Sequence, residues 1–247
     1  MERSAACVIS IAKNRELLES FFRAYFADPG AFRPAWFVSA FTRPEHPVIL
    51  NTAPAVIGRA RWGLVPSWTK DAAAAATISG RTFNARGETI LDKPSFRAPA
   101  RKRRCLVPVD GFFEWRSANG RKYPYFVHRT DGAPFALAGL WDTWAVPETG
   151  GELCTFTVVT TEANPLMAAV HNTKKRMPVI LPRAAEAAWL DLRLPETEIS
   201  GLCAPYPDTD LEAHPVSRLA SDARAERDRA EVVEPAQYPD LPPLGSE

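Results

Sequence analysis

The most informative segment of this chain reads Arg104-Cys105-Leu106-Val107-Pro108-Val109-Asp110-Gly111-Phe112-Phe113-Glu114-Trp115. It joins a basic run to apolar, strand-like sequence and ends with a carboxylate, Glu114, between two aromatic side chains. An apolar setting disfavours the charged form of a carboxyl group, raises its pKa and suits it to proton transfer. The segment therefore predicts strands with a candidate acid/base at Glu114. The alternative is a surface glutamate on an edge strand.

Strand-like runs also fill much of the remaining sequence. They are short apolar stretches bounded by turn residues, and they occur at 35–41, 48–50, 60–64, 105–107, 112–116, 125–128, 135–141, 154–160 and 177–181. Asn119-Gly120 predicts the tight turn of a β-hairpin. Such a succession of short strands is typical of sheets that curve and close on themselves.

Helices are expected to be few and short. We predict them at 15–27, capped by Asn14, at 162–170 and at 183–190, with 72–76 as a loop or short helix. After Pro205 the proline-rich sequence predicts an extended tail on the surface, briefly helical at 221–231. Together the patterns predict one α+β domain, with curved, mainly antiparallel β-sheets closing around a core and flanked by short helices.

The composition is that of a globular protein, with 46% hydrophobic and 24% charged residues. Because no signal-peptide-like start or long apolar stretch occurs, we expect an intracellular monomer without membrane contact. The four cysteines are far apart and have no histidine or cysteine neighbour at metal-ligand spacing. We therefore expect no metal, no cofactor and no disulfide framework.

The net charge of +1 conceals an uneven distribution. Up to residue 180 there are 24 Lys+Arg against 15 Asp+Glu; since the whole chain has 30 and 29, only 6 against 14 remain after it. A basic body suits a polyanion such as DNA, although a charge run can also be a solvated face. Aromatic residues near the arginines favour DNA, because exposed rings can stack on unpaired bases.

Three further segments accompany the opening one. They are Trp62-Gly63-Leu64-Val65-Pro66-Ser67-Trp68, Asn84-Ala85-Arg86-Gly87-Glu88-Thr89 and His171-Asn172-Thr173-Lys174-Lys175-Arg176-Met177-Pro178-Val179-Ile180-Leu181. With Cys7, these motifs resemble in order the SRAP family, the SOS-response-associated peptidases that shield abasic sites in single-stranded DNA. The resemblance runs from about Cys7 to Leu181. It implies an N-terminal extension at 1–6, an SRAP domain at 7–235 and a C-terminal tail at 236–247.

The resemblance also implies a chemistry for the site. In the family an N-terminal cysteine forms a Schiff base with the ring-opened abasic sugar, and its thiol then closes a thiazolidine ring. By position, Cys7 is the implied nucleophile, Asn84 holds the sugar oxygen or aldehyde, Glu114 moves the proton of the amine, and His171 protonates the sugar oxygen. An imidazole suits this role because it titrates near neutral pH.

The sequence departs from the family pattern at two places. Six residues precede Cys7, so its nitrogen is an amide and cannot form a Schiff base. Self-cleavage after Ala6, a start codon assigned too far upstream or an added leader, and a form that binds DNA without crosslinking are three explanations. The family spacing His-x-Arg-Met-Pro is lengthened by three residues between His171 and Arg176.

The expected partner is single-stranded DNA that contains abasic sites, including sites at junctions of single- and double-stranded DNA. The residues implied to contact it, in one groove ending at Cys7, are Trp62, Trp68, Arg81, Arg86, Arg103, Lys174, Lys175 and Arg176. For the two tryptophans the alternative is core packing, and for Arg86 it is a surface ion pair with Glu88.

Three functions remain open from sequence alone. The first is a DNA-damage protein that crosslinks to abasic sites. The second is a thiol peptidase or hydrolase that uses Cys7 with His171 and with Asn84 or Glu114. The third is a non-catalytic module that binds single-stranded DNA.

Overall fold

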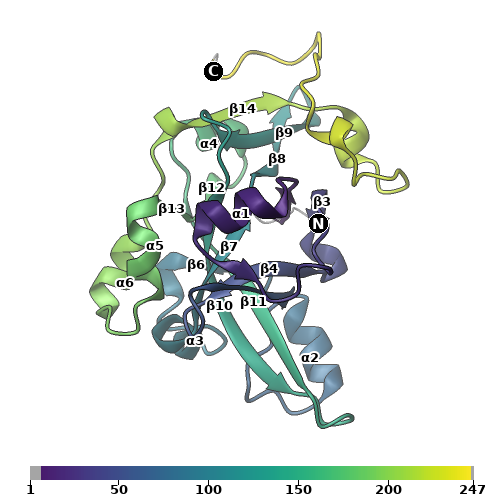
Figure 1. The fold of residues 1–247 in the computed structure, drawn as a ribbon. Coiled ribbons are helices and arrows are strands. Elements are labelled where there is room, and N and C mark those ends of the chain that lie inside the picture. The colour runs from purple at the N-terminus through teal and green to yellow at the C-terminus, as the bar shows by residue number, and fades with distance from the viewer. Residues whose placement is uncertain (1–6, 246–247) are drawn as a thin grey trace.

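The computed structural model describes residues 7–245 of the chain, and Figure 1 shows its course. Residues 1–6 and 246–247, and with them the expected N-terminal extension, lie outside the described part. No helix within residues 7–245 is long and apolar enough to cross a membrane.

The first sheet has five strands in the order β14-β9-β8-β1-β3. Each pairs antiparallel with its neighbours. Their bounds are β1 Val8–Ile11, β3 Ala35–Ser39, β8 Gly111–Ala118, β9 Arg121–Arg129 and β14 Leu211–Pro215. The turn between β8 and β9 is the predicted one: Asn119 and Gly120 both have positive φ, at 50° and 71°, as a two-residue hairpin turn requires.

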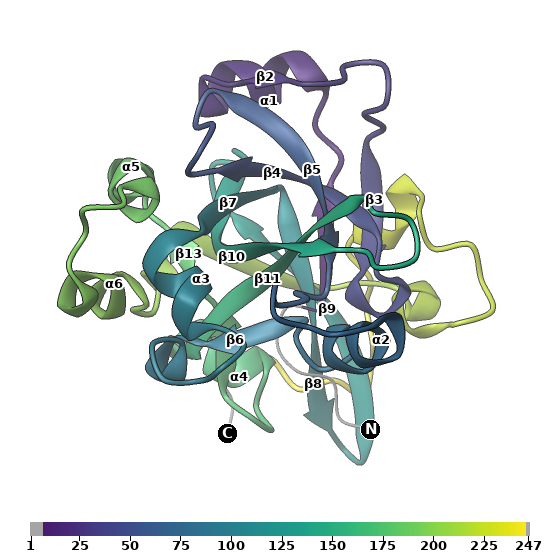
Figure 2. The same cartoon turned by 90° about the horizontal axis from the view of Figure 1, so that it is seen from below.

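The second sheet closes into a five-stranded barrel. Its strands are β4 Glu45–Leu50, β5 Val56–Trp62, β7 Arg104–Val109, β10 Phe135–Ala145 and β11 Glu152–Glu162. They pair in the order β11-β10-β7-β4-β5, and β5 returns to pair parallel with β11 at Phe156↔Trp62. Figure 2 shows the five strands from below. The expected α+β fold with sheets closing around a core is thereby confirmed.

Four short strands extend this sheet. They are β2 Tyr25–Phe26, β6 Asn84–Arg86, β12 Arg176–Pro178 and β13 Ile180–Leu181. β6 pairs parallel with β11, placing Asn84 next to Val158, and β12 pairs antiparallel with the end of β11. The long strand β11 therefore holds several of the segments that carry the sequence motifs.

The segment 104–115 connects the two sheets, because it forms β7 of the barrel and then the first half of β8. At the junction a carboxylate oxygen of Asp110 accepts hydrogen bonds from the backbone N–H groups of Ala12 and Lys13. The next residue must be glycine, since a Cβ there would lie 2.3 Å from the Phe126 ring. This residue choice fixes how one sheet lies on the other.

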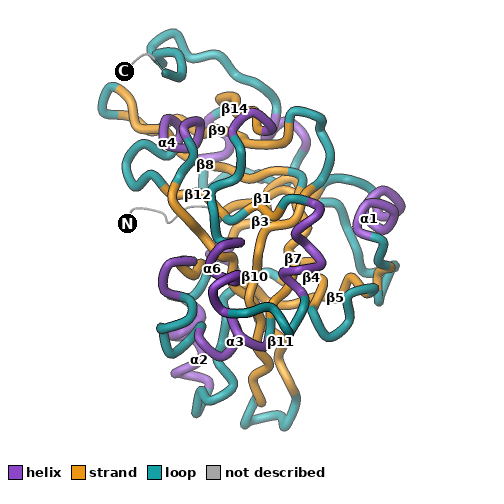
Figure 3. Tube along the Cα trace, turned by 90° about the vertical axis from the view of Figure 1, so that its left-hand side faces the viewer, coloured by secondary structure: helices purple, strands orange, loops and turns teal. Residues whose placement is uncertain are grey.

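The described chain has six α-helices, which lie at the periphery of the two sheets (Figure 3). They are α1 Arg15–Phe22, α2 Ala72–Ser79, α3 Arg97–Lys102, α4 Pro165–Val170, α5 Glu186–Leu190 and α6 Glu196–Leu202. The side chain of Asn14 caps α1 as predicted, by accepting from Leu17 N at 2.9 Å. The expected end at residue 27 was wrong: Arg23 turns left-handed at φ 53°, and the chain continues as β2.

Two clusters of buried side chains form most of the core. One joins the two sheets and includes Cys7, Ile9, Trp62, Phe112 and Phe156. The other lies between the barrel strands and the helices α1, α5 and α6. The candidate site adjoins the first cluster. The last residue of the basic run 101–104 lies beside the second cluster, since Arg104 is fully buried and donates to the carbonyl of Trp189.

The chain after Pro205 is more ordered than expected. Strand β14 pairs with β9 and was not predicted as a strand. The described part of the tail then lies along the β8–β9 hairpin, where Arg116 donates to the carbonyls of Pro242 and Pro243 at 2.5 and 3.2 Å. Asp240 accepts from the Tyr123 hydroxyl at 2.6 Å.

Candidate active site

Cys7 lies immediately before β1 and is buried, with 3% of its surface exposed. Its carbonyl accepts from Ala40 N at 2.9 Å, which fixes the backbone. β1 and β8 pair in the register Ile9↔Phe112. Continuing this register by two residues puts Cys7 opposite Glu114, and strand alternation puts both on the sheet face that carries Ile9 and Phe112.

Asn84 approaches the thiol from the barrel. It is the first residue of β6, and its side-chain nitrogen donates to Cys7 Sγ at 3.5 Å. Asn84 is a strand residue, and the short 3₁₀ turn that follows begins later, at Gly87. An amide N–H beside the sulfur is placed to donate to an oxygen bound there.

Glu114 and His171 face each other from different elements. Glu114 lies within β8 and His171 caps the end of α4. His171 Nε2 is 4.0 Å from Glu114 Oε2, and both side chains are buried. This spacing is longer than a direct hydrogen bond, so an oxygen of a substrate or water positioned beside the pair could contact both.

The backbone selects which imidazole nitrogen faces Glu114. His171 Nδ1 lies 3.0 Å from the carbonyl oxygen of Arg176. A carbonyl can only accept, so Nδ1 carries a proton and Nε2 is left for proton exchange on the Glu114 side. The arrangement supplies an acid/base pair beside a thiol and an amide donor.

The longer spacing between His171 and Arg176 forms a closed loop. Lys175 N donates back to the His171 carbonyl at 2.8 Å, and Lys175 itself is left-handed at φ 48°. The Arg176 guanidinium binds both carboxylate oxygens of Glu88, at 2.5 and 3.0 Å, and the carbonyl of Thr160. These contacts with Arg176 outweigh the effect of burial and lower the pKa of Glu88.

The other cysteines are poor nucleophiles. Burial raises the pKa of the Cys154 thiol to about 11 and that of Cys203 to about 12, and that of Cys105 well above its ordinary value. These thiols stay protonated at neutral pH and are unreactive. Burial also lowers the pKa of His46 to about 4, so this histidine is neutral and structural.

Comparison with known proteins places this chain in a family. Residues 7–222 match the family described as SOS response associated peptidase (SRAP). The chain belongs to the SRAP family. It is 35% identical over 211 residues to the abasic site processing protein YoqW of Bacillus subtilis, covering 85% of this chain and 90% of that protein. It is 30% identical over 230 residues to the abasic site processing protein HMCES of Gallus gallus, covering 78% and 67%.

A solved structure has the same fold. The crystal structure of a protein from Bacteroides thetaiotaomicron matches with a TM-score of 0.87 at 31% identity, covering 94% of this chain and all of that one. The barrel and its companion sheet are thus shared with a chain of quite different sequence.

Of the residues expected in this SRAP chain to contact DNA, five are exposed: Trp68, Arg81, Arg86, Lys174 and Lys175. Arg81 follows α2, Arg86 ends β6, and the lysines follow α4. All three elements lie in the lower half of Figure 2, and Figure 1 separates them in height, with α2 near the bottom and α4 near the top. The exposed side chains, including Trp68 at 58% exposure, therefore follow a basic edge along one side of the molecule.

Trp62 corrects the expectation of a DNA-facing ring. It is fully buried, its Nε1 donates to the Phe83 carbonyl at 2.9 Å, and its ring stacks on Phe156 at 5.6 Å. The tryptophan belongs to the core cluster that joins the two sheets, so we leave it out of the DNA-contacting set. The alternative of core packing was the right one.

Two expected DNA contacts have protein partners. Arg176 is half-buried against Glu88, the carboxylate that would pair with Arg86 in the alternative to DNA contact. Arg103 pairs with Asp142 at 3.1 Å, and Asp142 also accepts from Ser67 N at 3.0 Å. Arg103 therefore supports the loop that presents Trp68.

The sequence did not predict that Phe41 lies close to the candidate site. Phe41 is 45% exposed, and its ring meets the ring of Phe83 edge-on at 5.5 Å. Phe83 directly precedes Asn84 in the chain. Phe41 also follows Ala40, whose N–H binds Cys7. Periodicity cannot reveal such a residue, because it lies in a 3₁₀ turn after β3 and gains its place by long-range packing.

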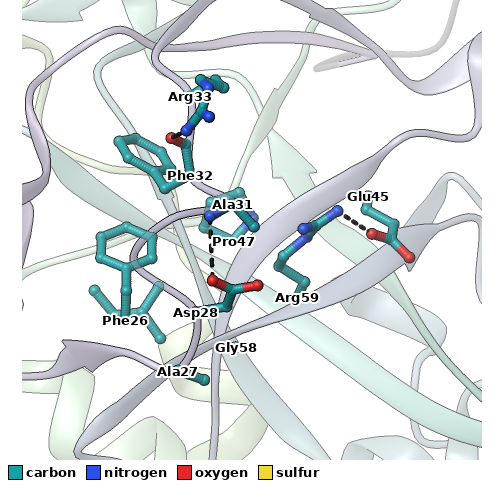
Figure 4. Close-up of a pocket in the computed structure, with 11 residues that line it drawn as sticks. Phe26, Ala27, Asp28, Ala31, Phe32, Arg33, Glu45, Pro47, Gly58 and Arg59 are labelled. Atoms are coloured by element: carbon teal, nitrogen blue, oxygen red, sulfur yellow. Dashed lines mark hydrogen bonds and ion pairs between the residues drawn. The ribbon is translucent and has the colours of Figure 1, made fainter.

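A cavity of about 400 Å³ lies elsewhere, between β2, the 27–33 loop and strands β4 and β5. Figure 4 shows its phenylalanines, Phe26 and Phe32, and the ion pair between Arg59 and Glu45. None of the candidate site residues lines it. Within residues 7–245 no three His, Cys, Asp or Glu side chains are grouped to hold a metal ion.

A matched pair of variants tests the placement of the tryptophans. Trp62→Ala should lower the free energy of unfolding by about 3–5 kcal/mol, because it empties a buried site. Trp68→Ala should change it by less than about 0.5 kcal/mol, as expected for a surface position, while weakening DNA binding. Denaturant unfolding and fluorescence titration with an oligonucleotide measure the two effects. Equal stability losses in both variants would contradict this assignment.

Proposed function

We propose that this SRAP protein binds single-stranded DNA and crosslinks covalently to abasic sites through Cys7, once residues 1–6 have been removed. The observation that carries the proposal is that Asn84 donates to the buried Cys7 thiol, while the register of β1 and β8 puts Glu114 opposite Cys7 and His171 lies 4.0 Å from Glu114. Relatives at 30–35% identity are named abasic site processing proteins.

The chemistry needs two groups of one residue. The free α-amine of Cys7 attacks the aldehyde of the ring-opened sugar, and loss of water leaves a Schiff base. Addition of the thiol S–H across the C=N bond then closes a thiazolidine ring, with the proton passing to nitrogen. An α-amine with a pKa near 8 is partly unprotonated at neutral pH and can start this sequence.

Each neighbouring group has a role in this scheme. The Asn84 amide, already donating to Sγ, binds the sugar oxygen or aldehyde. His171 Nε2 protonates the ring oxygen as the sugar opens, and Glu114 handles the proton of the amine. Two groups 4.0 Å apart can act at successive steps on the ring oxygen and on the attacking amine without moving.

Exposure of the amine requires cleavage of the peptide bond between Ala6 and Cys7. We propose that the same site supports this hydrolysis, in which water adds to the carbonyl of residue 6 and the Cys7 amine leaves with a proton. It would be a single-turnover form of the thiol peptidase alternative. Intact mass of the purified protein over time tests it: a loss equal to residues 1–6 supports self-cleavage, and an unchanged mass argues against it.

One experiment separates the three functions. The protein is incubated with a single-stranded oligonucleotide that contains an abasic site and with an intact control, and then run on a denaturing gel. A heat-stable shifted band with the abasic strand alone supports crosslinking. Turnover of peptide substrates instead would support a hydrolase, and binding without any covalent band would support a non-catalytic module.

Binding should depend on the exposed basic edge. The double variant Arg81→Ala, Lys174→Ala should bind single-stranded DNA more weakly than wild type. The plot of log affinity against log salt should become shallower by about 0.7 for each lost phosphate contact. Lys122→Ala removes an exposed charge on β9 and is the control. The same loss in that control would show that net charge, and not this edge, sets affinity.

A further inference from the structure

Asn172, the residue after His171, binds the backbone of β8 through both ends of its side-chain amide. Its Oδ1 accepts from Ser117 N at 3.0 Å, and its Nδ2 donates to the Ser117 carbonyl at 2.8 Å. Two hydrogen bonds from one side chain to one residue fix both position and orientation. Asn172 belongs to the segment 171–181, but the resemblance implied no role for it.

The contact occupies a stretch of the β8 edge that no strand of residues 7–245 covers. β1 pairs with β8 at Gly111 and Phe112, and β9 pairs with the other edge as far as Ala118↔Arg121. In an antiparallel strand the N–H and C=O of one residue point to the same side. Since both groups of Ser117 meet Asn172, the amide takes the place that a neighbouring strand would have had and satisfies that edge.

The same strand carries Glu114, three residues before Ser117, and antiparallel pairing to β9 holds this stretch of β8 in register. On the other side, Asn172 is bonded directly to His171, whose loop is closed by Lys175 N donating to the His171 carbonyl at 2.8 Å. The amide therefore joins the loop that carries His171 to the strand that carries Glu114.

We propose that Asn172 is a positioning residue: it sets the 4.0 Å separation of His171 Nε2 and Glu114 Oε2 by fastening the loop after α4 to β8. The effect of Asn172 on crosslinking rests on the proposed function, whereas its effect on the position of His171 rests on the hydrogen bonds to Ser117. Asn172 acts through His171 and touches neither thiol nor DNA in this role.

Removal of the amide should slow the chemistry and spare binding. In a chain that begins at Cys7, Asn172→Ala should crosslink about 10- to 100-fold more slowly, because small misplacements of a catalytic group have effects of this size. Affinity for intact single-stranded DNA should stay within twofold. Thr173→Ala, at the exposed neighbouring position, is the matched control and should crosslink at the wild-type rate.

The isosteric variant Asn172→Asp should give a pH-dependent crosslinking rate, an effect that a loss of stability alone would not produce. Asn172→Asp keeps the acceptor for Ser117 N but, when ionised, turns an oxygen toward the Ser117 carbonyl. Protonation restores a donor, so the deficit relative to wild type should shrink as pH falls from about 8 toward the ordinary Asp pKa of about 3.9. A deficit that is constant over this range would overturn the proposal.

A measurement without DNA separates this inference from the proposed function. In protein labelled with ¹⁵N-histidine, the His171 ring shifts are followed through a pH titration in wild type and Asn172→Ala. Glu114 is a carboxyl group that faces Nε2; the Arg176 guanidinium is held by Glu88, and Arg116 by the tail carbonyls. A looser loop moves the imidazolium away from a carboxylate, so the titration midpoint should fall in the variant.

The outcomes are distinct. An unchanged His171 titration with unchanged crosslinking refutes the positioning role while the proposed function stands. A shifted titration in a protein that never crosslinks, even when it begins at Cys7, refutes the proposed function and keeps the positioning role. A drop in melting temperature for Asn172→Ala, with a wild-type rate, would reduce Asn172 to a stabilising residue and overturn the inference.

Discussion

A chain that begins at Cys7 should form a heat-stable crosslink with an abasic oligonucleotide, and a chain that retains residues 1–6 should form none. The reason is covalent: with six residues in front, the Cys7 nitrogen is an amide whose lone pair is delocalised, and it cannot condense with an aldehyde. The effect is all or none. Denaturing electrophoresis, with intact mass measured on the same samples, checks it.

Three variants sharpen this result. In the chain that begins with residue 7, Cys7→Ser keeps the amine and should give a Schiff base that borohydride traps, without a stable crosslink in its absence. Cys7→Ala should behave likewise. Cys154→Ser, which alters a half-buried thiol of high pKa, should crosslink normally. A stable crosslink from a protein that still carries Met1 would refute the proposed mechanism.

Glu114→Gln and His171→Ala should each slow crosslinking by about 10²–10⁴-fold, the range that a general acid or base contributes. Glutamine keeps the shape of Glu114 but cannot exchange a proton, and alanine removes the ring nitrogen of His171 that faces Glu114, Nε2. Binding to intact single-stranded DNA should hardly change. Crosslinking rates, measured in single turnover with saturating protein, give the result directly.

Melting temperatures of the same variants distinguish catalysis from support of the fold. Both side chains are buried, so a purely structural role predicts a large loss of stability and near-normal chemistry in the protein that remains folded. His46→Gln is the matched control, because His46 is also buried and is neutral, and its Nε2 lies 2.9 Å from the Pro108 carbonyl oxygen, away from the candidate site. A wild-type rate in both catalytic variants would mean that the acid/base assignment is wrong.

Local sequence signals were sufficient for much of the fold. The Asn119-Gly120 turn and the apolar runs of β7 to β11 are encoded in adjacent residues, so they could be predicted. β2, β6 and β14 could not, because each is short and becomes a strand only by pairing with a partner far away in sequence. Likewise α1 stops at Arg23 for a reason of backbone conformation that its apolar face does not reveal.

The site shows the same division. The resemblance implied a common site for Cys7, Asn84, Glu114 and His171, and in the structure Asn84 donates to Cys7 while His171 lies 4.0 Å from Glu114. Their exact neighbours could not be predicted. Trp62 is buried while Trp68, six residues later, is exposed, and Glu88 forms its ion pair with Arg176. These contacts depend on which side chains remain exposed when the barrel closes, and a linear motif carries no information on that.

The closure of the barrel also determines when in folding the site can exist. The parallel pair Phe156↔Trp62 joins residues 94 positions apart, and Val158↔Asn84 joins residues 74 apart. Pairings of such long range form slowly, because the intervening chain must first lose its freedom. Until β11 is in place, Asn84 has no strand to lie on and α4 cannot bring His171 to Glu114. A newly made chain thus carries the Cys7 thiol for some time before Asn84 and His171 reach the places that they have in the folded protein.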